Sequence, residues 1–135
     1  MNENWHIVGC IQENVAKKLG MQGRTPIWIN DKILKHIEDR HGRELSNMRT
    51  SAQAFIHRVV SGFNNAYLQK DGTILLAVVG GQKSLCTYIK LEHATENYWR
   101  VKSAHIRSNS ELARYKAIWS KPKTTKKPAK KKRQA

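Results

Sequence analysis

Several features that assign a chain to a common class are missing from this sequence. No apolar run approaches the roughly 18–20 residues of a membrane span, and the opening MNENWHIVGC lacks the charged-then-apolar layout of a signal peptide. The 2 cysteines, Cys10 and Cys86, lie far apart, so no disulfide framework is indicated and both are expected as buried, reduced thiols. We therefore expect a soluble, cytoplasmic protein.

The signatures of nucleotide and metal chemistry are also missing. The sequence has no phosphate-binding loop, no Gly-x-Ser-x-Gly elbow and no set of zinc ligands. Its acidic residues are poorly placed to hold two Mg²⁺ ions, because Asp31, Glu38 and Asp39 share one predicted helix and Asp71 lies in a predicted turn. No metal or cofactor is expected, and a two-metal nuclease is disfavoured.

Positive charge is what the sequence has in excess. Its 25 Lys and Arg residues face 10 Asp and Glu, for a formal net charge of +15. Residues 1–119 hold 17 of the basic side chains and all 10 acidic ones, so that part alone carries +7. Nucleic acid is the commonest polyanionic partner of such a protein, and no basic amphipathic helix with a clean apolar face points to a membrane. The other eight basic residues lie in the last part of the chain: Lys121, Lys123, Lys126, Lys127, Lys130, Lys131, Lys132 and Arg133.

Hydrophobic periodicity predicts one α+β domain over residues 1–119, followed by a disordered Lys/Pro-rich tail over 120–135. In this fold, N-terminal helices pack on a four-stranded antiparallel β-meander, and a short helix ends the domain. Asp71-Gly72 is predicted as a two-residue hairpin turn. Helices are predicted over residues 11–19, 31–41 and 110–119, and Gly42 is predicted to end the second of these. A further helix is predicted to begin at a capping box over 50–53 and to end near Gly62. A short strand is predicted at 27–29, and the strands of the meander are predicted at 66–69, 73–79, 84–91 and 98–107.

The densest cluster of titratable groups lies on the helix predicted over 31–41. His36 and His41 are one position too far apart to share a helix face as zinc-protease histidines do. His41 instead continues the apolar face and points toward the sheet, while Arg40 neighbours His36 on the flank. From this helix alone, His41 is either a structural residue at the helix C-terminus or a catalytic one.

A second cluster lies on the last predicted strand. Alternation places Ser103, His105 and Arg107 on one face, and Tyr88 and Lys90 of the preceding strand are expected on the same surface. The plain alternative is a solvated polar face.

The same alternation, extended backwards, puts Trp99 and Val101 on the polar face as well. A β-bulge near Val101 or Lys102 would resolve this conflict, because one extra residue reverses the alternation.

Together these pieces resemble the Barnase–EndoU–colicin–RelE (BECR) superfamily of metal-independent ribonucleases, particularly its phage-associated branch. The resemblance covers residues 5–119, and its most specific part is the helix with the pattern HI-x-x-RH. The other matching segments are the opening WHIVGCIQENVAKKLG, the strand-to-helix segment IWINDKILKHIEDRH, the second helix, the meander, and the strand KSAHI followed by a helix with Tyr115.

The resemblance implies a ribonuclease in which a helical histidine, a strand Ser or Thr and basic groups meet on the concave face of the sheet. The family's helix motif falls on His36, Arg40 and His41, and its strand hydroxyl falls on Ser103. The chain departs from the family in having Ser103 where threonine is more usual and His105 where an apolar aromatic is more usual. Whether His105 replaces a helical histidine as acid or base stays open.

RNA supplies its own nucleophile, the 2′-OH, so cleavage requires only a base, an acid and cations near the phosphorane. We expect an endoribonuclease that leaves a 2′,3′-cyclic phosphate, with His41 as base or acid and His36 or His105 as its complement. Ser103 would hydrogen-bond the scissile phosphate. The residues expected to stabilise charge or bind RNA are Arg40, Lys90, Lys102, Arg107 and Tyr88.

Two other functions remain open: a non-catalytic nucleic-acid-binding protein, and a small phage inhibitor of a host protein. Clustered His, Ser and Arg side chains favour the enzyme, whereas the basic tail fits enzyme and binding protein equally. The expected partner is an RNA substrate, whether tRNA, mRNA or rRNA. The protein is expected to be a monomer in the cytoplasm of a bacterial host. If the protein is a toxin, its +7 body indicates an acidic antitoxin or immunity protein.

Overall fold

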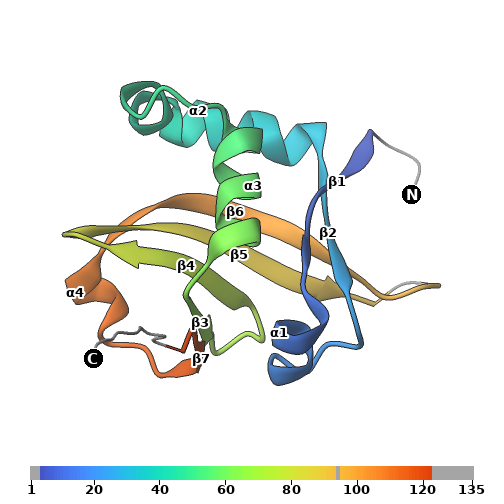
Figure 1. The fold of residues 1–135 in the computed structure, drawn as a ribbon. Helices are drawn as coiled ribbons and strands as arrows, with labels where there is room; N and C mark the ends of the chain where they lie inside the picture. Colours follow the sequence, from blue (N-terminus) through green and yellow to red (C-terminus); the bar gives the residue numbers. More distant parts are fainter. Residues whose placement is uncertain (1–3, 94, 123–135) are drawn as a thin grey trace, which may run out of the picture.

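The computed structural model describes residues 4–93 and 95–122, which form an α+β fold around one mixed sheet (Figure 1). The helices are α1 (Glu13–Lys18), α2 (Asp31–Asn47), α3 (Ala52–Gly62) and α4 (Asn109–Leu112). The strands are β1 (Trp5–Ile11), β2 (Thr25–Asn30), β3 (Asn65–Leu68), β4 (Ile74–Gly80), β5 (Lys83–Glu92), β6 (Tyr98–Ser108) and β7 (Ala117–Ser120). None of the described helices is long and apolar enough to cross a membrane.

The sheet has the strand order β1-β2-β6-β5-β4-β3-β7. Strands β3 to β6 pair antiparallel in chain order, as the meander predicts. The predicted size of the sheet was nevertheless wrong, because the described residues form a sheet of 7 strands and not of four. β2 lies parallel to β6 and β7 lies antiparallel to β3, so both edges of the meander gain backbone hydrogen-bond partners.

Helix α2 is longer than predicted. Asn30 caps its start by accepting a hydrogen bond from the backbone N–H of Ile33 at 2.8 Å. The stop predicted at Gly42 was wrong: the backbone only kinks at His41 (φ −125°, ψ 16°), and helix resumes as far as Asn47. The buried side chain of Leu45 anchors this extension in the core.

The turns and caps differ from the sequence prediction in detail. Ser51, and not Thr50, caps α3 by accepting a hydrogen bond from the N–H of Ala54 at 3.1 Å, and the predicted capping box is not formed because Ala54 has no side-chain acceptor to complete it. The connection between β3 and β4 is wider than a two-residue turn, because it runs from Gln69 to Thr73, whose backbones are joined at 2.8 Å. Gly72 supplies the positive φ of 87° that this wider turn requires.

The C-terminal helix predicted over residues 110–119 was wrong beyond its first turn. Helix α4 ends at Leu112, and residues 117–120 form β7 beside β3. The ring of Trp119 meets Phe63 edge-on at 5.3 Å. Pairing with the exposed edge of β3 and this aromatic contact both favour a strand here over another helical turn. Of the predicted tail, residues 123–135 lie outside the described part of the chain.

Apolar side chains pack on both faces of the sheet. On one face, α2 and α3 cover the main core, which includes Phe55, Leu76 and Ile89 (Figure 1). On the opposite face a smaller cluster joins Leu75 of β4 to Leu112 of α4. This second face is only partly covered, and the polar residues of β5 and β6 open onto it. Both cysteines are free; Cys86 is buried in the smaller cluster, whereas Cys10 is only half-buried.

Candidate active site

A β-bulge in β6 determines which side chains face the site. Tyr88 pairs with Ser103 and Ile89 pairs with Val101, which leaves Lys102 as the extra residue. Val101 is thereby returned to the main core, where it is fully buried. The bulge predicted near Val101 or Lys102 is confirmed. Because of it, Ser103, His105 and Arg107 lie on the less covered face of the sheet.

The imidazoles of His41 and His105 lie together at the edge of β6. Strand β2 pairs with β6 only at Trp99 and Arg100, so in the described sheet the second half of β6 has no strand on that side. Helix α2 packs against β6 instead, and the two imidazole rings stand 5.0 Å apart, tilted by 34°. A helical histidine and a strand histidine are thus neighbours. His41 itself stands at the kink of α2, where the backbone leaves helical geometry before the second helical segment begins.

Glu44 orients the ring of His41. Its Oε1 lies 3.1 Å from Nδ1 of His41, and the His41 side chain is only 23% exposed. With Nδ1 donating to the carboxylate, Nε2 of His41 is the nitrogen left for other chemistry. Sequence reasoning missed Glu44 because the predicted helix stopped at Gly42. The spacing of three residues after His41 was the available signal.

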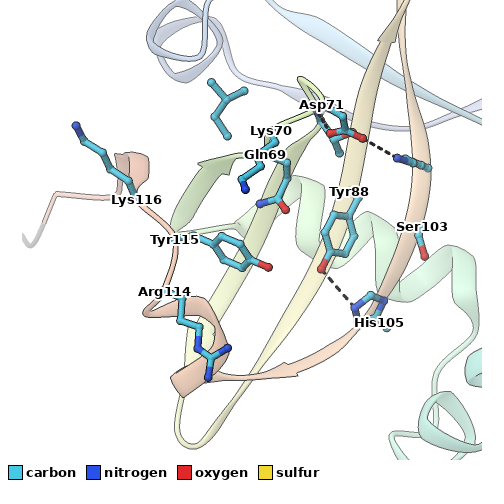
Figure 2. A pocket seen from close by; sticks show the side chains of 12 residues that line it. Gln69, Lys70, Asp71, Tyr88, Ser103, His105, Arg114, Tyr115 and Lys116 are labelled. Atoms are coloured by element: carbon cyan, nitrogen blue, oxygen red, sulfur yellow. Dashed lines mark hydrogen bonds and ion pairs between the residues drawn. The ribbon is translucent and has the colours of Figure 1, made fainter.

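His105 is held in an environment that favours its neutral form. Burial, followed by the positive charges of His41 and Arg107, lowers the pKa of His105 below the ordinary histidine value. Its Nε2 lies 3.4 Å from the hydroxyl of Tyr88, while its Nδ1 is buried without a hydrogen-bond partner among the described residues. Figure 2 shows the Tyr88 hydroxyl directed at this ring. A neutral imidazole in this position can accept a proton.

Arg107 contacts three side chains of the site. Its guanidinium donates to the hydroxyls of Tyr88 at 2.8 Å and Tyr115 at 3.2 Å, and it pairs with Glu111 at 3.3 Å. Burial raises the pKa of Tyr88 to about 12, so this phenol stays protonated at neutral pH. One fixed cation therefore positions two aromatic rings. The sequence analysis placed Tyr115 in the C-terminal helix predicted over residues 110–119 and so missed its place here.

An open pocket of about 770 Å³ adjoins these groups on the less covered face of the sheet (Figure 2). Lys102 borders it and is paired with Asp71 at 3.0 Å. This ion pair and the hydrogen bond from the Thr73 N–H hold the pKa of Asp71 well below its usual range. The pocket is lined by Leu68, Gln69, Lys70, Asp71, Thr73, Tyr88, Lys102, Ser103, His105, Arg114, Tyr115 and Lys116.

Three of the predicted site residues lie apart from this arrangement. His36 and Arg40 are exposed on α2, and within the described part of the chain no hydrogen bond or ion pair joins either to the site. Lys90 pairs in register with Arg100, on the far side of the bulge, and does not line the pocket. The predicted residues that do line or adjoin the pocket are His41, Tyr88, Lys102, Ser103, His105 and Arg107.

The arrangement has the groups for proton transfer and for anion binding. It contains two adjacent imidazoles, a hydroxyl from Ser103 and several cationic side chains. Over residues 4–93 and 95–122, no three His, Cys, Asp or Glu side chains gather as the ligands of a metal ion would. No family model, curated protein or solved structure matches this chain.

Proposed function

We propose that this protein is a metal-independent endoribonuclease, related to the BECR superfamily, that acts in the cytoplasm of a bacterial host. The observation that carries the proposal is the ring contact of His41 and His105, with centroids 5.0 Å apart beside a cation-lined pocket. Two imidazoles at this separation can serve the entering and leaving oxygens of one phosphate. General acid–base catalysis of RNA cleavage needs one base and one acid, and imidazoles can fill both roles.

In the proposed reaction His105 is the base and His41 is the acid. The lowered pKa of His105 keeps it neutral, so its Nε2 takes the proton of the 2′-OH. The 2′-oxygen then forms a bond to phosphorus as the bond to the 5′-oxygen breaks. His41, oriented by Glu44, gives a proton to that 5′-oxygen. The products are a 2′,3′-cyclic phosphate and a 5′-hydroxyl, and the two histidines have exchanged protonation states.

Cations and hydroxyls beside the pair stabilise the crowded phosphorane. Ser103 and Lys102 both line the pocket and donate to the non-bridging oxygens. In the free protein Lys102 is paired with Asp71, and both side chains are about half exposed. A phosphate oxygen can take the place of that carboxylate at little cost, because exposed ion pairs contribute little stability. Arg107 keeps a positive charge next to His105 throughout.

The test is digestion of RNA by the purified full-length protein. Fragments ending in a 2′,3′-cyclic phosphate are expected in excess EDTA, and His41→Ala is expected to produce them far more slowly. Sequencing of cyclic-phosphate ends after expression in a bacterial host would identify the RNA that is cut. Activity that is abolished by chelation and restored by Mg²⁺ would contradict the acid–base mechanism.

A non-catalytic nucleic-acid-binding protein is the second candidate. The exposed cations Lys70, Arg114 and Lys116 at the pocket favour it, since they would hold phosphates without any reaction. RNA that is bound by the wild-type protein and recovered intact would select this function. An acidic inhibitor protein fits the charge under either candidate.

A further inference from the structure

The pocket extends well beyond the histidine pair. It shares Tyr88, Ser103 and His105 with the proposed catalytic groups, and then continues to the β3–β4 connection and to residues 114–116. Its volume of about 770 Å³ lies within the range of roughly 300–1,000 Å³ typical of small-molecule sites. The reaction at one phosphate leaves this additional space unused.

Two tyrosines form an aromatic wall in this space. The hydroxyls of Tyr88 and Tyr115 are both held by the guanidinium of Arg107, at 2.8 and 3.2 Å. The ring of Tyr115 also lies beside the buried ring of Tyr67, with centroids 6.2 Å apart. Figure 2 shows Tyr115 across the pocket from Ser103 and His105. Rings that are fixed in this way suit stacking of a nucleobase, because little side-chain freedom is lost on binding.

Positive side chains surround the aromatic wall. Lys70, Arg114 and Lys116 are exposed at the pocket, and in the described part of the chain no ion pair engages any of them. Lys102 adds a fourth cation on the side of the catalytic groups. An aromatic platform next to a row of cations is the arrangement by which proteins bind single-stranded nucleic acid, with bases on the rings and phosphates on the cations.

We propose that this pocket is a subsite for the nucleotide next to the scissile phosphate, with its base stacked on Tyr115 and its phosphate held by the surrounding cations. The substrate is therefore single-stranded RNA. A base inside a duplex is already stacked and paired, and it cannot enter the pocket without being extruded. The assignment of the neighbouring phosphate rests on the proposed ribonuclease function, whereas the binding of an unstacked base does not.

The experiment measures binding without cleavage. The probe is a fluorescein-labelled 2′-O-methyl RNA hexanucleotide, which lacks the 2′-OH nucleophile, and affinity is read by fluorescence anisotropy. Tyr115→Leu is expected to raise Kd about tenfold or more, because it removes the ring on which the base stacks. Tyr115→Phe keeps the ring and is expected to change Kd less than about threefold. The same hexanucleotide in a duplex is expected to bind at least about tenfold more weakly.

The cations are tested by a second pair of substitutions, at the exposed residues Arg114 and Lys116. Arg114→Ala with Lys116→Ala should weaken binding and reduce its salt dependence by up to about 0.7 in log Kd per log salt for each phosphate that is no longer neutralised. The control, Lys18→Ala with Lys32→Ala, removes the same charge at exposed positions outside the pocket. If both double variants lose the same affinity, these cations contribute only through the net charge of the protein, and their assignment to the subsite is overturned.

The outcomes separate the two proposals. Unchanged affinity in a folded Tyr115→Leu protein overturns the stacking subsite, whatever happens to cleavable RNA. Equal affinity for the duplex overturns the single-strand assignment. If the expected dependence on Tyr115 is found while RNA with free 2′-OH groups is never cut, the subsite is supported and the endoribonuclease is wrong.

Discussion

Glu44 lies one helical turn after His41, and its Oε1 is 3.1 Å from Nδ1 of that imidazole. The contact exists because α2 continues beyond the kink at His41. It connects an exposed helical face to the ring that meets His105. The orientation of one member of the proposed catalytic pair therefore depends on a residue outside the pocket.

Removing the charge of Glu44 should slow the reaction without weakening substrate binding. Glu44→Gln is expected to lower kcat on the order of tenfold, the value of one charge-assisted hydrogen bond, and to leave KM unchanged. Steady-state kinetics on a short RNA measure both constants. Glu38→Gln makes the same charge change at an exposed position of α2. If both variants lose the same activity, net charge and not orientation is responsible.

Replacing either histidine of the pair should abolish most of the activity. His41→Ala and His105→Ala are each expected to lower kcat on the order of 10²–10⁴-fold, while the folded state is retained. The double variant should be little worse than either single one, because the two rings act as a unit. Cleavage rates and thermal unfolding are measured together, with His93→Ala at an exposed loop position as the control.

A purely structural His41 would give a different pattern. In that case His41→Ala would cost roughly 0.3–1 kcal/mol of unfolding free energy and leave cleavage intact. His36→Ala, made in parallel, decides between the two complements that the sequence left open. A loss of activity with His36→Ala equal to that expected for His105→Ala would transfer the assignment to His36.

The pH dependence of the rate should show the environment of His105. Because burial and nearby positive charge lower its pKa, the base stays active in more acidic solution than an ordinary histidine would. The acidic limb of the kcat/KM profile is expected below the ordinary value of about 6.5, and it should disappear in whatever activity His105→Ala retains. An acidic limb that persists unchanged in this variant would belong to another group.

The same pKa shift should appear in stability. In the unfolded chain His105 binds a proton more readily than in the folded protein, so the free energy of unfolding should rise with pH between the lowered folded pKa and about 6.5. Urea unfolding across this range measures the effect. His105→Gln should flatten the rise, whereas His93→Gln should retain it.

Truncation after Pro122 tests the role of the basic tail. It removes seven of the eight basic residues beyond position 120 and keeps Lys121, whose N–H donates to the carbonyl of Asn64 at 2.8 Å. The truncation should flatten the salt dependence of RNA affinity by up to about 0.7 in log Kd per log salt for each single-strand phosphate that the tail neutralises. The cleavage sites should not change. A new cleavage pattern would show that the tail takes part in recognition.

The prediction of which residues of β6 share a face was confirmed where it depended on local periodicity. Ser103 and His105 share a face because side chains alternate along a strand, and the conflict at Val101 correctly indicated a bulge. The prediction of the helix end at Gly42 was wrong, because a glycine is compatible with more than one structure. Gly42 is compatible with a helix end and with a helix interior, and packing of Leu45 in the core favoured the second.

Local pattern and composition were sufficient to predict the α+β class, the order of the four meander strands and the basic character of the chain. The parallel pairing of β2 with β6 and the pairing of β7 with β3 were found in the three-dimensional fold alone. The tertiary structure also placed His41 beside His105, and Tyr115 across the pocket from His105. These relationships join segments far apart in the chain, and they depend on which strand edges and helix faces become available to one another during folding. Periodicity records which side of an element is buried, but not the element that covers it.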